Sequence, residues 1–97
     1  MKAFNRTPEV QQAIEQFERL TGKKVIKAKR HEGSMRGYVQ FVYSGDWDEI
    51  KKVDNEKYEG DWFYQLGDCV ITYKSNLDQF GGKWAGKMAV EVRWEDL

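Results

Sequence analysis

The sequence predicts an α+β domain in which one N-terminal amphipathic helix packs on a four- to five-stranded, mostly antiparallel sheet, giving two layers. Three observations support this: an apolar stripe at helical spacing near the N-terminus, two apolar runs around one turn dipeptide, and strict alternation near the C-terminus. The helix precedes every predicted strand and there is no Gly-rich phosphate fingerprint, which argues against a βαβ nucleotide-binding fold. At 97 residues, we expect a single domain, 1–97, with one modest core.

The predicted helix spans Pro8–Thr21. Thr7 is its N-cap, Pro8 suits the first helical position, and Gly22 is the expected C-terminal stop. One apolar stripe recurs at steps of three and four residues and consists of Val10, Ala13, Ile14, Phe17 and Leu20.

Two strands are predicted next, at residues 23–30 and 36–43. The five residues 31–35 between them contain a Gly and suit a hairpin loop. Residues 46–53 are expected to form a short helix or turn capped by Asp46. Residues 54–60 are interpreted as a polar connector.

A central hairpin is predicted at residues 61–73. Gly67-Asp68 separates two apolar runs and fits a two-residue primed turn, in which Gly takes a positive φ. Because strand side chains alternate, the turn also predicts the core face. The expected cross-strand pairs on that face are Leu66 with Cys69, Tyr64 with Ile71, and Trp62 with Tyr73.

The C-terminal part is predicted as a loop followed by a strand. The loop covers residues 75–82 and is broken by Gly81-Gly82, and the strand covers residues 88–94. One face of this strand should be buried and the other wet. The buried face would carry Met88, Val90, Val92 and Trp94, and the wet face Ala89, Glu91 and Arg93.

Charge is balanced overall but divided along the chain. There are 16 basic and 16 acidic residues. Nine Lys or Arg and four acids lie up to Gly45, whereas seven Lys or Arg and twelve acids lie from Asp46 onward. Such asymmetry is typical of a partner-binding face, although folding also interleaves charges in space. Four Trp, five Tyr and five Phe supply core area and candidate interface anchors.

The remaining composition predicts a cytoplasmic protein. One Cys excludes an internal disulfide and suits a reducing compartment. No apolar run approaches the length of a membrane span, and the first residues lack the apolar core of a secretory signal. We expect no membrane association and no cofactor.

The sequence also predicts a non-enzymatic protein. Nucleophilic catalysis requires a base near the nucleophile, but His31 falls in a basic loop and Cys69 in a predicted buried strand. The acids of residues 46–49 match no calcium loop and suit a helix start, so no metal site is expected.

One basic and aromatic segment is the candidate for binding single-stranded RNA or DNA. Cations contact phosphates, and flat side chains stack on bases. Residues 36–38 open like the RNA-recognition-motif signature, but Val39 and Gln40 depart from it, so no family is assigned. Lysines at a sheet edge also prevent aggregation, which is the alternative explanation. The nucleic-acid candidates are Lys23, Lys27, Lys29, Arg30, Arg36, Tyr38, Phe41 and Tyr43.

The preferred hypothesis is a small binding protein that acts through protein–protein contacts with an unidentified partner. Domains of this size without a catalytic motif are often accessory or inhibitor proteins, as in phages and mobile elements. The acidic segment 46–61 would meet a basic surface of the partner. The candidate contacts lie outside the clear strand patterns and are Trp47, Asp48, Glu49, Tyr58 and Trp84.

Overall fold

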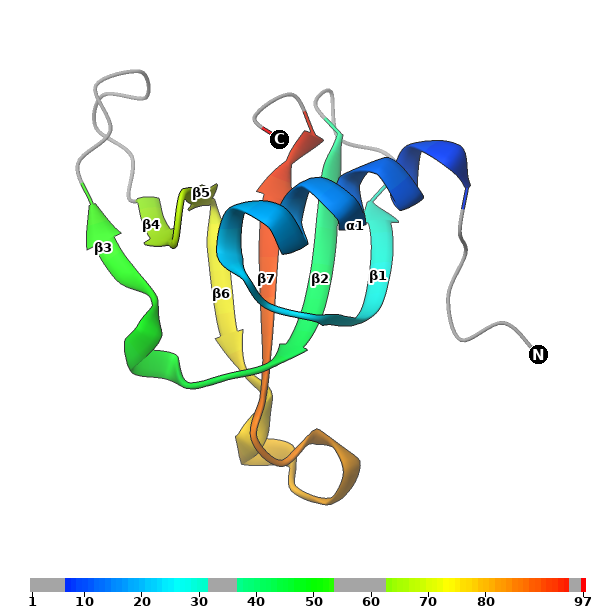
Figure 1. Ribbon diagram of the computed structural model, residues 1–97. Helices are drawn as coiled ribbons and strands as arrows, with labels where there is room; N and C mark the ends of the chain where they lie inside the picture. The colour runs from blue at the N-terminus through cyan, green and yellow to red at the C-terminus, as the bar shows by residue number, and fades with distance from the viewer. Residues whose placement is uncertain (1–6, 32–36, 54–62, 95–96) are drawn as a thin grey trace.

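The computed structural model describes residues 7–31, 37–53, 63–94 and 97, and shows one α-helix and two antiparallel sheets (Figure 1). The helix is α1 (Pro8–Thr21). In spatial order, sheet A contains β1 (Val25–His31), β2 (Tyr38–Ser44), β7 (Lys87–Arg93) and β6 (Tyr73–Asn76). Sheet B contains β3 (Lys51–Val53), β4 (Phe63–Leu66) and β5 (Cys69–Ile71). The α+β class and the antiparallel pairing are confirmed, but the strands divide between two sheets where one was expected.

Helix α1 begins and ends as predicted. Thr7 Oγ1 accepts a hydrogen bond of 3.2 Å from the Val10 N–H. Gly22 is left-handed, with φ 72°, and its N–H donates to the Glu18 carbonyl at 2.8 Å. The stripe is buried except for Leu20, which is partly buried.

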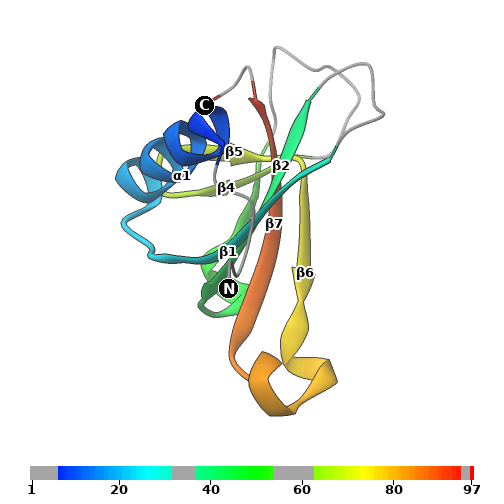
Figure 2. The ribbon, with the colours of Figure 1, turned by 90° about the vertical axis from the view of Figure 1, so that its right-hand side faces the viewer.

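The inner face of sheet A, defined as the face toward α1, carries most of the core. Figure 2 shows α1 on one side of this sheet. The Phe17 ring stacks on Phe41 at a centroid distance of 4.5 Å and lies 6.0 Å from the Tyr43 ring. The strand residues buried on this face are Ala28, Val39, Phe41, Tyr43, Met88, Val90 and Val92.

The β4–β5 hairpin has the predicted register. Tyr64 pairs with Ile71 and Leu66 with Cys69. Gly67 has φ 58° and no non-Gly residue of the described chain has positive φ, which fits a type II′ turn. The Asp68 N–H donates to the Leu20 carbonyl at 2.9 Å, so the helix end also contacts sheet B.

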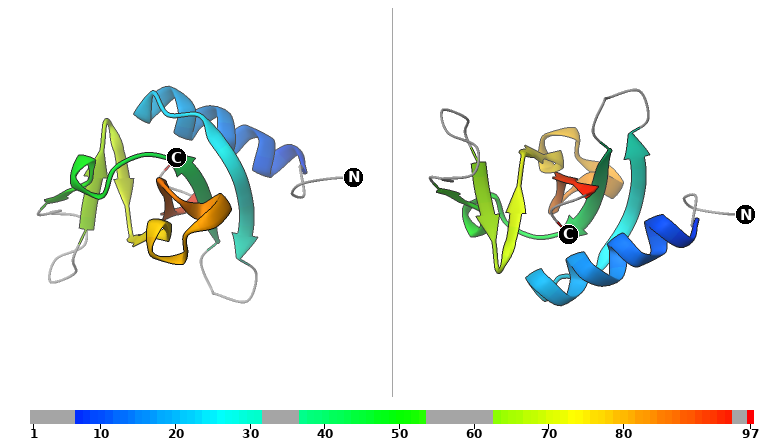
Figure 3. Two further views of the ribbon diagram at one scale, coloured as in Figure 1. Left: turned by 90° about the horizontal axis from the view of Figure 1, so that it is seen from below. Right: turned by 90° about the horizontal axis from the view of Figure 1, so that it is seen from above.

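The prediction that Tyr73 pairs with Trp62 on the core face was wrong. The chain bends at Thr72, whose N–H and Oγ1–H both donate to the Glu91 carbonyl, at 2.9 and 3.0 Å. This bend transfers the chain from sheet B to sheet A, where Tyr73 pairs with Glu91 and is 51% exposed. Trp62 lies outside the described residues. Figure 3 shows sheet B and β1 on opposite sides of the molecule.

Two shorter predictions need correction. The segment 46–53 is a 3₁₀ turn, η1 (Trp47–Glu49), followed by β3, although Asp46 does cap it through the Asp48 N–H at 3.3 Å. The predicted loop 75–82 begins inside β6. It then forms η3 (Leu77–Phe80) and η4 (Gly82–Trp84), and we call residues 77–86 the flap.

Strand β7 is more buried than its alternating pattern predicts. Met88, Val90 and Val92 are buried as expected. Ala89 and Arg93, expected on the wet face, are buried as well. The reason is tertiary: β7 lies between β2 and β6, and flap residues lie beside Ala89.

Candidate functional site

A groove of about 410 Å³ opens on the outer face of sheet A, the face turned away from α1. Its floor comes from Gln40 and Val42 of β2 and Ala89 of β7. The two walls come from β1 and from the flap, which Figure 2 shows at the lower end of β6 and β7. We call it the outer groove. One wall is formed by Lys27 and Lys29 with Ala28 between them, whose side chain lies on the inner face, and the other by Leu77, Phe80 and Trp84.

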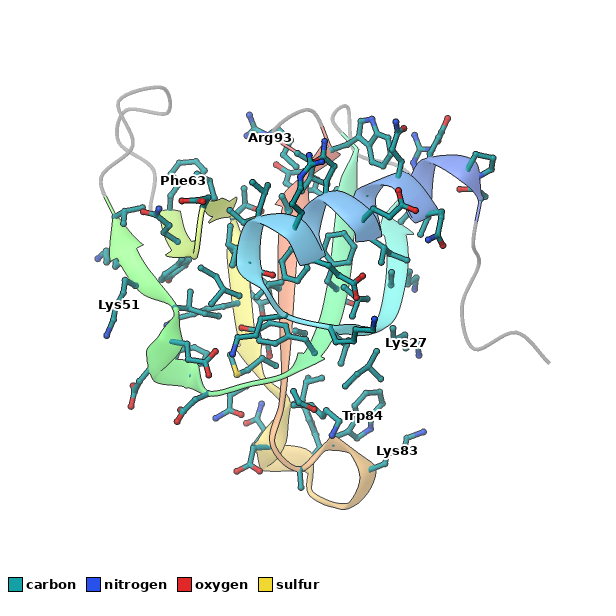
Figure 4. All side chains as sticks on the ribbon, in the orientation of Figure 1. Lys27, Lys51, Phe63, Lys83, Trp84 and Arg93 are labelled. Carbon is teal, nitrogen blue, oxygen red and sulfur yellow. The ribbon has the colours of Figure 1, made fainter. Side chains whose placement is uncertain are left out.

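Positive charge surrounds the aromatic wall of the outer groove. The Lys27 Nζ lies 5.8 Å from the Trp84 ring centroid, and the Lys83 Nζ lies 5.1 Å from it. Figure 4 labels Trp84 and Lys83 at the lower end of the molecule and Lys27 above them. Ammonium groups at such distances are attracted to the face of an indole ring. Phe80 is 66% exposed, so the groove combines open apolar surface with lysine ammonium groups.

Local hydrogen bonds shape the flap. Asn76 Oδ1 accepts from the Asp78 N–H at 3.0 Å, and Asp78 Oδ1 accepts from the Gly86 N–H at 2.8 Å. The second bond joins the two ends of the flap. Three glycines with positive φ allow its turns: Gly81, Gly82 and Gly86.

Three of the nucleic-acid candidates lie on the outer face. Lys27 and Lys29 line the outer groove and are exposed. Tyr38 lies farther along β2, paired with Arg93, whose guanidinium carbon is 6.0 Å from the Tyr38 ring centroid. Because side chains alternate along β2, Tyr38 lies on the outer face, whereas Phe41 and Tyr43 lie on the inner face.

The other nucleic-acid candidates that the structure describes do not join this surface. Phe41 and Tyr43 are fully buried against Phe17, so their assignment as contact residues was wrong. Lys23 Nζ forms an ion pair of 2.6 Å with Glu49. Arg30 forms an ion pair with Glu9 of α1, and Arg36 lies outside the described residues.

The protein-binding candidates are divided between two places. Trp84 lines the outer groove, whereas Trp47, Asp48 and Glu49 form η1. Trp47 is 40% exposed, and the Lys74 Nζ lies 3.9 Å from its ring centroid. Tyr58 lies outside the described residues.

Lys74 of β6 contacts the segment around η1. Its Nζ donates to the Ile50 carbonyl at 3.2 Å and to the Trp47 carbonyl at 3.5 Å. Burial lowers the pKa of Lys74, while the carboxylate of Asp48 opposes that change. The ammonium group and the Lys23–Glu49 pair both offset acidic charge in this segment, which weakens the expectation that η1 presents an acidic surface.

Sequence reasoning missed most of the apolar lining of the outer groove. Leu77 and Phe80 fall in a segment predicted as an ordinary loop, and Ala89 was expected on a wet face. The Asn76-x-Asp78 spacing and the following glycines were the available signal, because Asx side chains and Gly together indicate a structured turn. That signal predicts a shaped loop, but not the strand face against which it lies.

Cys69 and His31, the residues considered for nucleophilic catalysis, lie in different strands, β5 and β1. Cys69 is buried, as predicted. His31 ends β1. Within residues 7–31, 37–53, 63–94 and 97, no group of three or more His, Cys, Asp or Glu side chains could hold a metal ion. The one described helix is too short and too polar to span a bilayer.

Comparisons with known proteins do not extend these observations. No model of a protein family matches the chain, no curated protein matches it, and no solved structure matches its fold.

Proposed function

We propose that this protein is a non-catalytic binding protein that contacts a partner protein through the outer groove. The observation that carries the proposal is the groove itself: a floor in which Val42 and Ala89 lie beside Gln40, and an aromatic wall, open to solvent, with lysines at its edges. Concave apolar sites with a few polar groups are the usual form of a binding pocket.

The arrangement of Phe80 and Trp84 supports a protein ligand. Aromatic side chains are enriched among the residues that dominate binding energy at protein interfaces. Here both stand on a flap whose ends are joined by the Asp78–Gly86 hydrogen bond. A wall held in this way loses little conformational entropy on binding, which favours affinity.

The proposal includes an accessory or inhibitor role in the cytoplasm, of the kind found in phages and mobile elements. The support is general: a chain of 97 residues has room for one modest core and one recognition surface. Such a protein acts by occupying a surface of its partner.

Single-stranded nucleic acid is a second candidate ligand, favoured by one observation. Lys27 and Lys29 share the outer face of sheet A with Tyr38 and Phe80. Three phosphate contacts predict a slope of about −2 for log K against log salt, so a fourfold rise in salt would lower affinity about twentyfold.

Affinity capture from cells that encode the protein, followed by reconstitution with the purified partner, tests the proposal. A Phe80→Ser/Lys29→Glu variant should lose the partner, because it removes apolar surface and reverses one charge in the groove. A Gln12→Ser variant on the exposed face of α1 is the matched control and should retain it.

Treatment with nuclease separates the two candidates. A partner that survives nuclease and binds the purified wild-type protein directly supports protein binding. Capture that disappears with nuclease supports nucleic acid, and a partner that binds the groove variant as well as wild type contradicts the proposed site.

A further inference from the structure

The lining of the outer groove also specifies the chemistry of its ligand, if the proposed function holds. We infer that the groove binds an acidic segment of the partner protein, which inserts one aliphatic or aromatic side chain between Val42 and the flap. The carboxylates of this segment lie against Lys27, Lys29 and Lys83.

The floor of the groove provides the apolar subsite. Val42 and Ala89 are buried, and the small side chain of Ala89 leaves depth beside Leu77 and Phe80. A volume of about 410 Å³ lies within the range of pockets that enclose a drug-sized ligand. It therefore holds one large side chain with part of its neighbours, and burying that side chain drives binding.

The edges of the groove provide the charge selection. Lys27 and Lys29 are exposed on one wall, Lys83 stands on the flap, and none of the described lining residues carries a carboxylate. Among the described residues, Asp78 and Glu91 are acids on neighbouring positions: Asp78 is engaged by the Gly86 N–H, and Glu91 pairs with Gln40 in the register of β2 and β7. The local excess of positive charge favours an acidic ligand.

The same features favour an acidic peptide over a nucleic-acid strand. The ammonium groups of Lys27 and Lys83 lie within 6 Å of the Trp84 ring centroid, so they compete with a base for the faces of that ring. Beside Gln40, the floor is formed by the aliphatic side chains of Val42 and Ala89, which receive a side chain without needing a flat ring.

Four synthetic probes test the inference on the 97-residue protein by NMR titration at low salt. The first is a five-residue peptide with a central Trp and two Glu on each side. The second replaces every Glu with Lys, the third replaces the Trp with Ala, and the fourth is an eight-nucleotide oligothymidylate. The amide signals of Val42, Phe80 and Ala89 report binding in the groove.

We expect the acidic Trp peptide to shift these signals and to bind at least tenfold more tightly than the basic peptide and the Ala peptide. Removing each lysine should weaken binding about two- to fivefold, the range that one exposed ion pair contributes. Lys27→Ser and Lys29→Ser test this, and Lys51→Ser on β3 of sheet B is the matched control that should have no effect. Phe80→Ser should weaken the acidic Trp peptide without changing the fold, because Phe80 is exposed.

Several results would overturn the inference. They are equal affinity of the acidic and basic peptides, shifts located away from the groove, equal loss in Lys51→Ser, and tighter binding of oligothymidylate than of the acidic peptide. These failures are distinct from failure of the proposed function. A captured partner that depends on Phe80 but is not displaced by the acidic peptide removes this inference alone, whereas absence of any protein partner removes the proposed function.

Discussion

Gly67 shows how one residue connects the helix to the second sheet. Its φ of 58° is in the left-handed region, and a Cβ at this position would lie 2.5 Å from the Leu20 carbonyl oxygen. The adjacent Asp68 N–H donates to the same oxygen. Only a residue without a side chain permits this close approach between the hairpin turn and the end of α1.

Gly67→Ala should therefore destabilise the protein by about 2–4 kcal/mol, since a left-handed Ala costs about 1 kcal/mol and the clash adds to it. Gly82→Ala is the control: it has a similar φ of 55° but no atom within 4 Å of the new Cβ. Urea unfolding of both variants measures the difference. Equal losses would mean that the contact with Leu20 does not constrain the turn.

Tyr43 places a hydroxyl in the core. The residue is fully buried, and its Oη finds no hydrogen-bond partner among the described residues. A buried hydroxyl without a partner is unfavourable, whereas the ring packs on Phe17 and leaves no room for a side chain at position 45, which is Gly45. Tyr43→Phe should leave the free energy of unfolding at neutral pH unchanged or raise it by up to about 1 kcal/mol.

The same substitution should change the response to alkaline pH. Burial, with the charge of Glu49 as a smaller cause, raises the pKa of Tyr43 above its usual value of about 10. As the pH rises, Tyr43 therefore loses its hydroxyl proton in the unfolded chain before it does so in the folded protein. Protonated Tyr43 imposes no pH-dependent loss of stability below about pH 10, and the free energy of unfolding falls as the pH rises above that value. Above about pH 10, the free energy of unfolding of wild type should fall more steeply than that of Tyr43→Phe, by up to about 1.4 kcal/mol per pH unit. Parallel stability curves for the two proteins would contradict this.

At the scale of elements, the apolar stripe of α1 supplies a direct test of the core. Ile14 is buried in the stripe, and Gln12 is exposed two residues earlier. Ile14→Asp buries an unpaired charge and should cost about 3 kcal/mol or more of a total of roughly 5–15 kcal/mol. Gln12→Asp should cost less than about 0.5 kcal/mol. The melting temperatures of Ile14→Asp and Gln12→Asp measure this difference. Equal melting temperatures for the two variants would contradict the observed orientation of α1.

A side-chain hydrogen bond from the Gly86 N–H to Asp78 Oδ1 joins the two ends of the flap. Asp78→Ala removes the acceptor of the Gly86 N–H and should destabilise the flap by about 1 kcal/mol, with faster hydrogen exchange at Gly86. Asp78→Asn retains an oxygen acceptor and should exchange at nearly the wild-type rate. Unchanged exchange in Asp78→Ala would show that this bond does not hold the flap.

For the whole molecule, the two sheets share a core. Leu66, Cys69 and Ile71 of sheet B belong to the same buried cluster as Phe17 and Tyr43. We therefore expect one cooperative unfolding transition. Tryptophan fluorescence and far-UV circular dichroism should give coincident midpoints in urea, and two separated transitions would divide the chain into independent units.

Local signals in the sequence predicted the elements well. The caps at Thr7 and Gly22 and the apolar stripe define α1, and Gly67-Asp68 defines the register of the β4–β5 hairpin. These features depend on residues a few positions apart, so periodicity and turn chemistry suffice to predict them. The alternation of apolar and polar residues in β7 likewise predicted the burial of Met88, Val90 and Val92.

The assignment of strands to sheets, and with it the candidate site, came only from the tertiary structure. The bend at Thr72 depends on a carbonyl nineteen residues away, at Glu91, and no local pattern marks it. The outer groove likewise joins β1, β2, β7 and the flap, and unites Lys27 and Trp84, which the sequence had assigned to different functions. The sequence by itself determined the apolar stripe of α1, the register of the β4–β5 hairpin and the burial of Met88, Val90 and Val92 in β7. Only long-range packing decided which apolar surfaces are buried in the core and which remain exposed to solvent in the outer groove. The reason is that the burial of a surface depends on which other elements cover it.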